Sequence, residues 1–146
     1  MKDQAIFDHE KPNVCQVELS FVARAANLLE EIKAASDGSS GGVCDQLDRA
    51  TLSALLNTAE GKGKRQTRQR ARFFDDARGS AVECSACLEA LVAKRLTNAE
   101  QIADGKAMLL RVVGMLTKLV NRFDGATNHL HEDAQTYDNH SRGGNA

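Results

Sequence analysis

Residues 45–72 read DQLDRATLSALLNTAEGKGKRQTRQRAR, and this stretch decides the fold. Apolar residues follow two helical stripes here: Leu47, Ala50, Ala54 and Thr58 on one side, and Leu52, Leu55, Leu56 and Ala59 on the other. A helix that is apolar nearly all round must be covered on several sides. The stretch therefore predicts a helix inside a bundle, or between a bundle and a neighbouring subunit. We expect it to start near Val43 or Cys44. It should end at Gly61 and Gly63, because glycine readily adopts the left-handed conformation that closes helices.

Apolar residues at steps of three and four predict three more helices. The buried stripes that we expect are Val14, Val17, Phe21, Ala25, Leu28 and Ile32; then Phe74, Ala77, Ala81, Cys84, Leu88 and Leu91; then Ile102, Leu109, Val113, Leu116, Val120 and Phe123. Asn13 is the expected cap of the first helix, and the third runs from within 66–72 to about Leu96. Thr97-Asn98-Ala99-Glu100 has the pattern of a capping box for the last helix, which Gly125 should end.

Four helices with short connections predict an all-α, antiparallel up-down four-helix bundle. The composition agrees, because Ala and Leu dominate while the chain has one Pro and no Trp. We divide the chain into an irregular N-terminal segment (1–12), the bundle domain (13–125) and a polar, flexible tail (126–146). Gly79 lies inside the third predicted helix beside Ser80 and Ala81, and this run of small residues predicts a close approach between helices.

The net charge is −1, so no overall field directs the chain toward nucleic acid or a membrane surface. The N-terminus lacks the apolar core of a signal peptide, and no stretch approaches the roughly 20 apolar residues of a membrane span. We expect a cytoplasmic protein with no membrane partner, in which the four cysteines stay as thiols.

Two blocks of sequence carry a family resemblance. They are Gln46-Leu47-x-Arg49-Ala50-x-x-Ser53-x-x-x-Asn57-x-Ala59-Glu60-Gly61-x-Gly63-Lys64 and Phe73-x-x-x-Ala77-x-Gly79-Ser80-x-x-Glu83. Both resemble the motifs of the 23S rRNA-intervening-sequence family of four-helix bundle proteins, although the family's proline after the motif serine is absent here. The resemblance covers about residues 14–124 and implies a bundle that assembles as a homopentameric ring. The family name reports a genomic location rather than an activity.

The motif residues form the expected structural set: Gln46, Arg49, Ser53, Asn57, Glu60, Gly61, Gly63, Gly79, Ser80 and Glu83. Their polar members lie on or beside apolar helices, so we expect a hydrogen-bonded network within the subunit or between subunits. One arrangement pairs Arg49 with Glu83 from the third helix. An acid–base pair of Glu60 and Glu83 is the alternative, with no other catalytic feature beside it.

A basic run follows the second helix, with six cations in eleven residues: Lys62, Lys64, Arg65, Arg68, Arg70 and Arg72. These residues are the candidate nucleic-acid contacts, as an edge that binds RNA or DNA phosphates. The alternative is a solvated helix start whose arginines pair with Asp75, Asp76 or the acidic first part of the chain. The Gly-Lys-Gly-Lys turn lacks the spacing and the preceding strand of a P-loop.

Neither the cysteines nor the histidines predict a metal site. Cys84-x-x-Cys87 is half of a zinc motif, and we expect two small buried residues instead. His129, His131 and His140 lie with Glu132 and Asp133 in the polar tail, where a divalent-metal site is the weaker alternative. We therefore expect neither a metal nor a cofactor.

The sequence favours a non-enzymatic, oligomeric four-helix bundle that acts as a structural or protein-interaction scaffold. Its expected partner is itself, as a pentamer. The second hypothesis is an accessory protein that binds RNA, DNA or a nucleic-acid enzyme. The resemblance supplies this idea, because related bundles that accompany diversity-generating retroelements bind a reverse transcriptase and nucleic acid. An enzyme is the third hypothesis, for which no nucleophile–base pair or nucleotide loop emerges.

Overall fold

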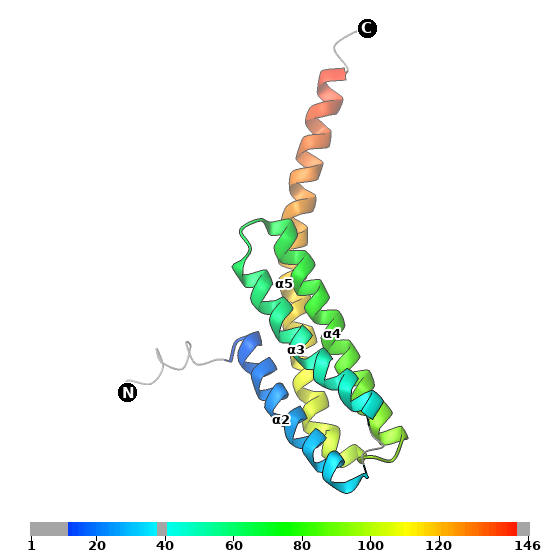
Figure 1. Cartoon of the computed structure of the whole chain (residues 1–146). Helices are drawn as coiled ribbons and strands as arrows, with labels where there is room; N and C mark the ends of the chain where they lie inside the picture. The colour runs from blue at the N-terminus through cyan, green and yellow to red at the C-terminus, as the bar shows by residue number, and fades with distance from the viewer. Residues whose placement is uncertain (1–11, 38–40, 143–146) are drawn as a thin grey trace, which may run out of the picture.

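The computed structural model describes the backbone of residues 12–37 and 41–142, and side chains within these ranges up to residue 125. Four helices make up this part of the chain: α2 (Val14–Ala35), α3 (Gly41–Gly63), α4 (Thr67–Ala93) and α5 (Ala99–Arg142). Successive helices run in opposite directions (Figure 1). The predicted all-α, up-down four-helix bundle is confirmed. The predicted irregular segment 1–12 lies outside the described residues, except for Pro12.

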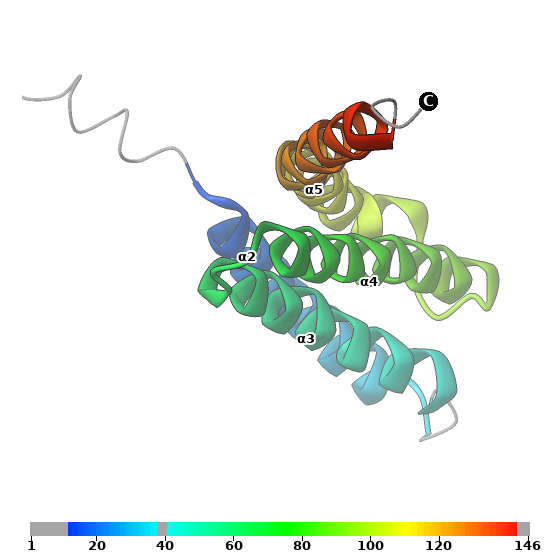
Figure 2. The ribbon, with the colours of Figure 1, turned by 90° about the horizontal axis from the view of Figure 1, so that it is seen from above.

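The helices pack in a closed order around one core. α3 packs against α4 and α4 against α5, while α2 lies beside α3 and α5 (Figure 2). The largest fully buried side chains include Leu47 of α3, Phe74 and Leu88 of α4, and Leu116 of α5. The stripes predicted for the first and third helices are buried at every position, which confirms them. In α5, Val112 is buried where the pattern predicted Val113, which is half-buried.

The start of α2 has the predicted cap. Asn13 Oδ1 accepts a hydrogen bond from the Gln16 amide at 3.0 Å, and the Asn13 amide donates to Gln16 Oε1 at 2.8 Å. This reciprocal pair satisfies two backbone donors at a helix end that would otherwise lack partners. The first turn of α2 is thereby fixed next to the buried Val14 and Val17.

The turn between α4 and α5 differs from the prediction by a few residues. α4 ends at Ala93, and Arg95 adopts the left-handed conformation (φ 62°) that glycine usually supplies. The predicted cap at Thr97 is wrong: Asn98 Oδ1 accepts from the Gln101 amide at 2.8 Å, and the Thr97 hydroxyl donates to Gln101 Oε1. Asn and Thr both cap helices well, so capping preference does not distinguish Thr97 from Asn98. The geometry of the turn determines which of them is the cap.

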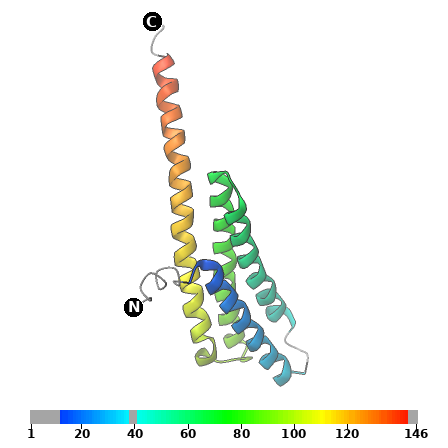
Figure 3. The same ribbon diagram turned by 90° about the vertical axis from the view of Figure 1, so that its left-hand side faces the viewer.

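The predicted end of the last helix at Gly125 is also wrong, because α5 continues to Arg142. One glycine inside a helix costs only about 1 kcal/mol, and no proline follows it before residue 142. With 44 residues, α5 is roughly 66 Å long. Its C-terminal part extends past the α3–α4 turn and lies apart from the other helices (Figure 3).

Gly61, rather than Gly79, is where two helices approach closely. A Cβ added at Gly61 would lie 2.7 Å from Phe74 Cε1, whereas nothing lies within 4 Å of a Cβ added at Gly79. The predicted close approach at Gly79 is therefore wrong. α3 does end at Gly63, but neither Gly61 nor Gly63 has a positive φ. Gly61 is needed for the space that it leaves to a buried ring.

Substitution of these two glycines by alanine should have opposite effects. Gly61→Ala should lower the free energy of unfolding by about 1–3 kcal/mol, because the buried Phe74 ring must move. Gly79→Ala, the matched control, should raise it by up to about 1 kcal/mol, because alanine is the better helix former. Urea denaturation of both variants measures the difference. A Gly61→Ala variant as stable as the parent would contradict the contact.

Candidate functional site

A polar seam runs along the outer side of the contact between α3 and α4. We define it as Gln46, Arg49, Ser53 and Asn57 of α3 with Ser80 and Glu83 of α4. These positions of α3 recur at steps of three and four, so one side of the helix carries them all. All six residues belong to the predicted structural set, and the fold brings them into one line.

Each end of the polar seam is a hydrogen-bonded group. Gln46 Nε2 donates to Glu83 Oε1, and Arg49 Nη2 donates to Gln46 Oε1 at 3.3 Å. Further along, the Ser53 and Ser80 hydroxyls are 2.8 Å apart, and Asn57 Nδ2 donates to the Ser53 carbonyl at 2.9 Å. The seam therefore fixes the register of α4 on α3.

The predicted Arg49–Glu83 pair is wrong in its detail, because the Gln46 amide stands between the two charges. All three side chains are exposed within the subunit. Exposed polar contacts of this kind add little to the stability of one chain. Their ordered arrangement on a free surface makes the seam a candidate contact region for a partner.

The motif's other acid, Glu60, lies away from this group and forms an ion pair with Lys64, with 3.4 Å between the charged atoms. Glu83 accepts its hydrogen bond from Gln46. The two carboxylates thus serve separate contacts, and the geometry does not favour their use as an acid–base pair.

Two of the apolar surfaces that the described residues leave exposed are the outer face of α3 and a groove between α4 and α5. The outer α3 face comprises Leu52, Leu56 and Ala59, with exposed fractions of 46% and 59% for the two leucines. The apolar groove between α4 and α5, about 400 Å³ in volume, is lined by Val82, Ser85, Lys106, Ala107, Leu109, Leu110 and Val113. Leu110 is 76% exposed at its rim. Three members of the predicted second stripe of α3, Leu52, Leu56 and Ala59, are thus exposed within the described subunit, whereas Leu55 is half-buried.

The basic run divides into cations that hold the fold and cations that do not. Arg70 Nε donates to the Gly61 carbonyl at 3.2 Å, and its guanidinium lies 4.5 Å from the centre of the Phe123 ring. Lys64 pairs with Glu60 and lies over the Phe73 ring. These two members of the predicted nucleic-acid set are therefore occupied by contacts within the subunit.

The other four cations, Lys62, Arg65, Arg68 and Arg72, are exposed. Arg68 and Arg72 line a groove of about 710 Å³ between α4 and α5, which we call the arginine groove. Its other lining residues are Gln66, Gln69, Ala71, Asp75, Arg78, Val120, Asn121 and Asp124. The nearby carboxylate of Asp75 forms its ion pair with Arg78. Neither Arg68 nor Arg72 has an ion-pair partner in the described part of the chain. The predicted pairing of the basic run with Asp75 is thus absent there.

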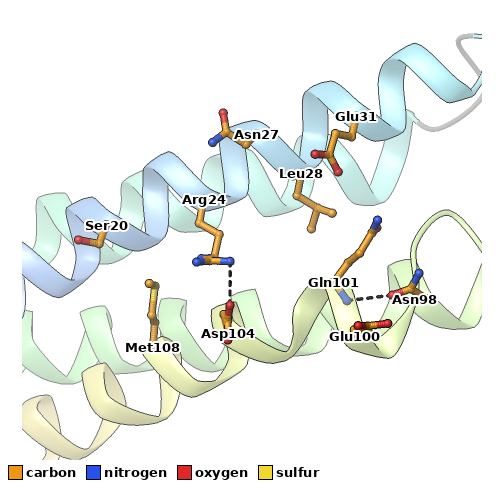
Figure 4. A pocket seen from close by; sticks show the side chains of 10 residues that line it. All are labelled: Ser20, Arg24, Asn27, Leu28, Glu31, Asn98, Glu100, Gln101, Asp104 and Met108. Atoms are coloured by element: carbon orange, nitrogen blue, oxygen red, sulfur yellow. Dashed lines mark hydrogen bonds and ion pairs between the residues drawn. The ribbon is translucent and has the colours of Figure 1, made fainter.

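A third groove, of about 780 Å³, separates α2 from the start of α5 (Figure 4). Arg24 of α2 points across it to Asp104 of α5, with 3.2 Å between the charged atoms. Glu31 and Glu100 also line it. Both partners of the ion pair are largely exposed, so the bridge contributes little to stability.

The cysteines are buried as predicted at Cys84 and Cys87, and all four are free thiols. Burial, followed by the neighbouring Cys87 and Glu83, raises the pKa of the Cys84 thiol to about 12. Burial also raises the pKa of Cys87. Neither thiol therefore has the low pKa of a reactive cysteine. Among the residues with described side chains, no cluster of three His, Cys, Asp or Glu is placed to hold a metal ion. The tail side chains, including His129, His131 and His140, lie outside them.

One buried carboxylate was missed by the sequence analysis. Glu18 of α2 is only 3% exposed and lies next to Thr58 of α3, with Glu18 Oε2 3.0 Å from Thr58 Oγ1. Its position one residue after Val17 and three before Phe21 was a usable signal, because it places a charged residue on the buried stripe.

The fold and the polar seam define a four-helix bundle protein whose motif residues lie at a helix–helix contact and on its exposed rim. This chain belongs to the 23S rRNA-intervening sequence protein family, whose sequence model matches residues 11–118. No curated protein gives a significant match. No helix within the described residues combines the length and the apolar character required to cross a membrane.

A solved structure supports the fold. It is the crystal structure of a protein of unknown function from the S23 ribosomal protein family of Bacteroides thetaiotaomicron. The two chains are 18% identical, and the match has a TM-score of 0.68 over 74% of this chain and 98% of the other. At this identity the likeness concerns the arrangement of the helices alone.

The two kinds of arginine in the basic run should respond differently to substitution. Arg70→Ala should lower the free energy of unfolding by about 1–2 kcal/mol, because it removes a hydrogen bond to the Gly61 carbonyl and a cation–π contact. Arg72→Ala should change it by less than about 0.5 kcal/mol, as surface substitutions usually do. Denaturant titration of the two variants compares them. Equal losses would contradict this division of the basic run.

Proposed function

We propose that this protein is a non-catalytic scaffold that assembles into a ring of identical subunits, for which the family resemblance implies five. The observation that carries the proposal is the pair of uncovered apolar surfaces on one subunit. The outer α3 face exposes Leu52 and Leu56, while Val82 and Leu110, 55% and 76% exposed, border the apolar groove. Full burial of one leucine side chain contributes about 1.5–3 kcal/mol. Four such residues would therefore contribute substantially to assembly.

The two apolar surfaces lie on different sides of the bundle. α3 packs against α2 and α4, and its outer face points away from the core, whereas the apolar groove lies along the α4–α5 edge. When two different surfaces of the same chain pair, each subunit leaves one of each surface free for the next. Repetition of such a contact closes a ring when the rotation between subunits permits it. This favours a ring over a symmetric dimer.

The polar seam supports the same assembly. On the helix surface, Arg49 lies between Leu52 and Gln46, so the seam borders the outer α3 face. Interfaces between proteins usually combine an apolar centre with a polar rim. We infer that the exposed Gln46–Glu83 group forms that rim and orients a second copy.

The non-catalytic part of the proposal is supported by the separate engagement of the motif acids. Glu60 is paired with Lys64 and Glu83 accepts from Gln46. The raised pKa values of Cys84 and Cys87 also argue against a nucleophilic cysteine among the buried thiols.

We also propose a second candidate function, in which the chain is an accessory protein that binds RNA or DNA phosphates. The specific observation is that Arg68 and Arg72 line an open groove together with Gln69 and Asn121, and have no ion-pair partner in the described residues. Arginine is well suited to phosphate because its planar fork donates two parallel hydrogen bonds. Asp75 and Asp124 line the same groove and oppose such binding, so the scaffold remains the leading function.

Charge substitutions on the outer α3 face should dissociate the assembly without unfolding the subunit. We expect Leu52→Glu with Leu56→Glu to shift the mass in light scattering from that of a ring, about 79 kDa for five subunits of 15.8 kDa, toward one subunit. Helical content by circular dichroism should stay unchanged, because both side chains are exposed. The matched control is Leu19→Glu on α2, which is also an exposed leucine and should leave the mass unchanged. A double variant with the parent's mass would contradict the proposed interface.

The arginine groove predicts a salt-dependent interaction with nucleic acid. Arg68→Ala with Arg72→Ala should weaken binding to structured RNA and reduce the slope of log affinity against log salt by about 1.5–2. Lys33→Ala with Arg111→Ala removes two exposed cations elsewhere and serves as the control. Fluorescence anisotropy at several salt concentrations measures both. If the Arg68/Arg72 double variant binds RNA with the parent's affinity and salt dependence, the proposed phosphate-binding function is ruled out.

A further inference from the structure

The buried carboxyl of Glu18 makes the only hydrogen bond between side chains of α2 and α3 in the described part of the chain. Its partner, Thr58, is fully buried, and the distance from Thr58 Oγ1 to Glu18 Oε2 is 3.0 Å. The second carboxyl oxygen, Oε1, is buried and has no hydrogen-bond partner among the described groups. An ionised carboxylate has about four acceptor sites, so this environment leaves most of them unsatisfied.

The hydrogen count at Thr58 favours a neutral Glu18. Thr58 Oγ1 is 3.0 Å from Glu18 Oε2 and 2.9 Å from the Ala54 carbonyl oxygen. The hydroxyl has one hydrogen and can satisfy only one of these two acceptors. If Glu18 is protonated, its O–H donates to Thr58 Oγ1 while the Thr58 hydroxyl donates to Ala54. Every short contact then has its own hydrogen.

The charged groups around Glu18 do not compensate its burial. Burial raises the pKa of Glu18 to about 7, although the Thr58 hydrogen bond and the Lys62 charge on α3 act to lower it. Lys62 is exposed, so water screens its charge. Cys84 on α4 also interacts with Glu18, but burial keeps that thiol neutral by raising its pKa to about 12. No titratable group of α5 is among the described groups that shift the Glu18 pKa.

α2 is the helix whose docking this carboxyl can control. α2 packs less extensively on α3 and α5 than α4 does, and it makes no direct contact with α4 at the level of the backbone. Besides the buried apolar packing of Phe21 near Gly105, its polar link to α5 is the exposed Arg24–Asp104 pair across the groove of Figure 4. Release of the N-terminal part of α2 breaks no α3–α4 or α4–α5 contact, although it exposes the buried Val14, Val17 and Phe21.

We propose that Glu18 is a proton-dependent latch: its neutral carboxyl holds the N-terminal half of α2 on α3, and its ionisation weakens that hold. The direction with pH follows from linkage. Below pH 4.5, the ordinary pKa of a glutamate, the carboxyl is neutral in both the docked and the released state. Docking is therefore strongest in this pH range. Between 4.5 and about 7 only the docked state keeps the proton, so docking weakens as the pH rises. Above about pH 7 the carboxyl is ionised in both the docked and the released state, so its protonation no longer favours docking.

Hydrogen exchange of the full-length chain tests the latch. Between pH 5 and pH 7 the opening constant of residues 14–21 should rise by about tenfold per pH unit, after correction for the intrinsic exchange rate. In Glu18→Gln, which keeps the shape of the side chain but cannot ionise, the opening constant should be independent of pH. Glu31→Gln, which removes an exposed carboxylate from the same helix, should follow the parent. A Glu18→Gln chain with the parent's pH dependence, or a parent with none, would overturn the proposal.

A measurement on the unmodified chain keeps the proposal testable if Glu18→Gln does not fold. Carbon-13 NMR of the glutamate carboxyl groups follows each titration directly. The latch requires one glutamate carboxyl that titrates near pH 7. The proposal is overturned if every glutamate carboxyl titrates below about pH 5.5.

Discussion

The close packing of α3 on α4 is the constraint on which the rest of the structure depends. Gly61 lets the two backbones approach until Phe74 lies against α3, and the Ser53–Ser80 contact holds the same pair of helices at mid-length. These contacts fix the rotation of α3 about its own axis. Because one side of α3 packs against α4 and the core, Leu52 and Leu56 point toward solvent. The uncovered apolar face is thus a consequence of the hairpin packing.

This rotation explains why the family's motif residues fall into two groups. Gly61 and Ser80 act inside the subunit, where they set the distance between helices. Gln46 and Glu83 belong to the same line but reach solvent, where their contact adds little to the stability of one chain. A single polar seam can therefore hold the hairpin and orient a neighbour. The free arginines lie at the other end of the hairpin, so phosphate binding and assembly would use separate parts of the molecule.

The sequence predicted the helices and their buried stripes well, because burial of Leu47 or Leu88 follows directly from a period of 3.6 residues. It was less successful wherever two groups of similar propensity competed or a contact joined distant residues. Gly61 and Gly79 are equally permissive in isolation, and only the position of Phe74 distinguishes them. The burial of Glu18 follows from its place on the buried stripe of α2, but its hydrogen bond with Thr58, forty residues away, could not be predicted from the sequence.

The proposed ring requires that another copy of the chain covers the outer α3 face. Hydroxyl-radical footprinting of the unmodified protein tests it directly, by comparison of oxidation at Leu52 and Leu56 with oxidation at Leu19, which is similarly exposed in one subunit. If the ring forms, Leu52 and Leu56 should be protected at high concentration and become oxidised on dilution, while Leu19 should be oxidised throughout. Equal oxidation of all three leucines at every concentration would contradict it.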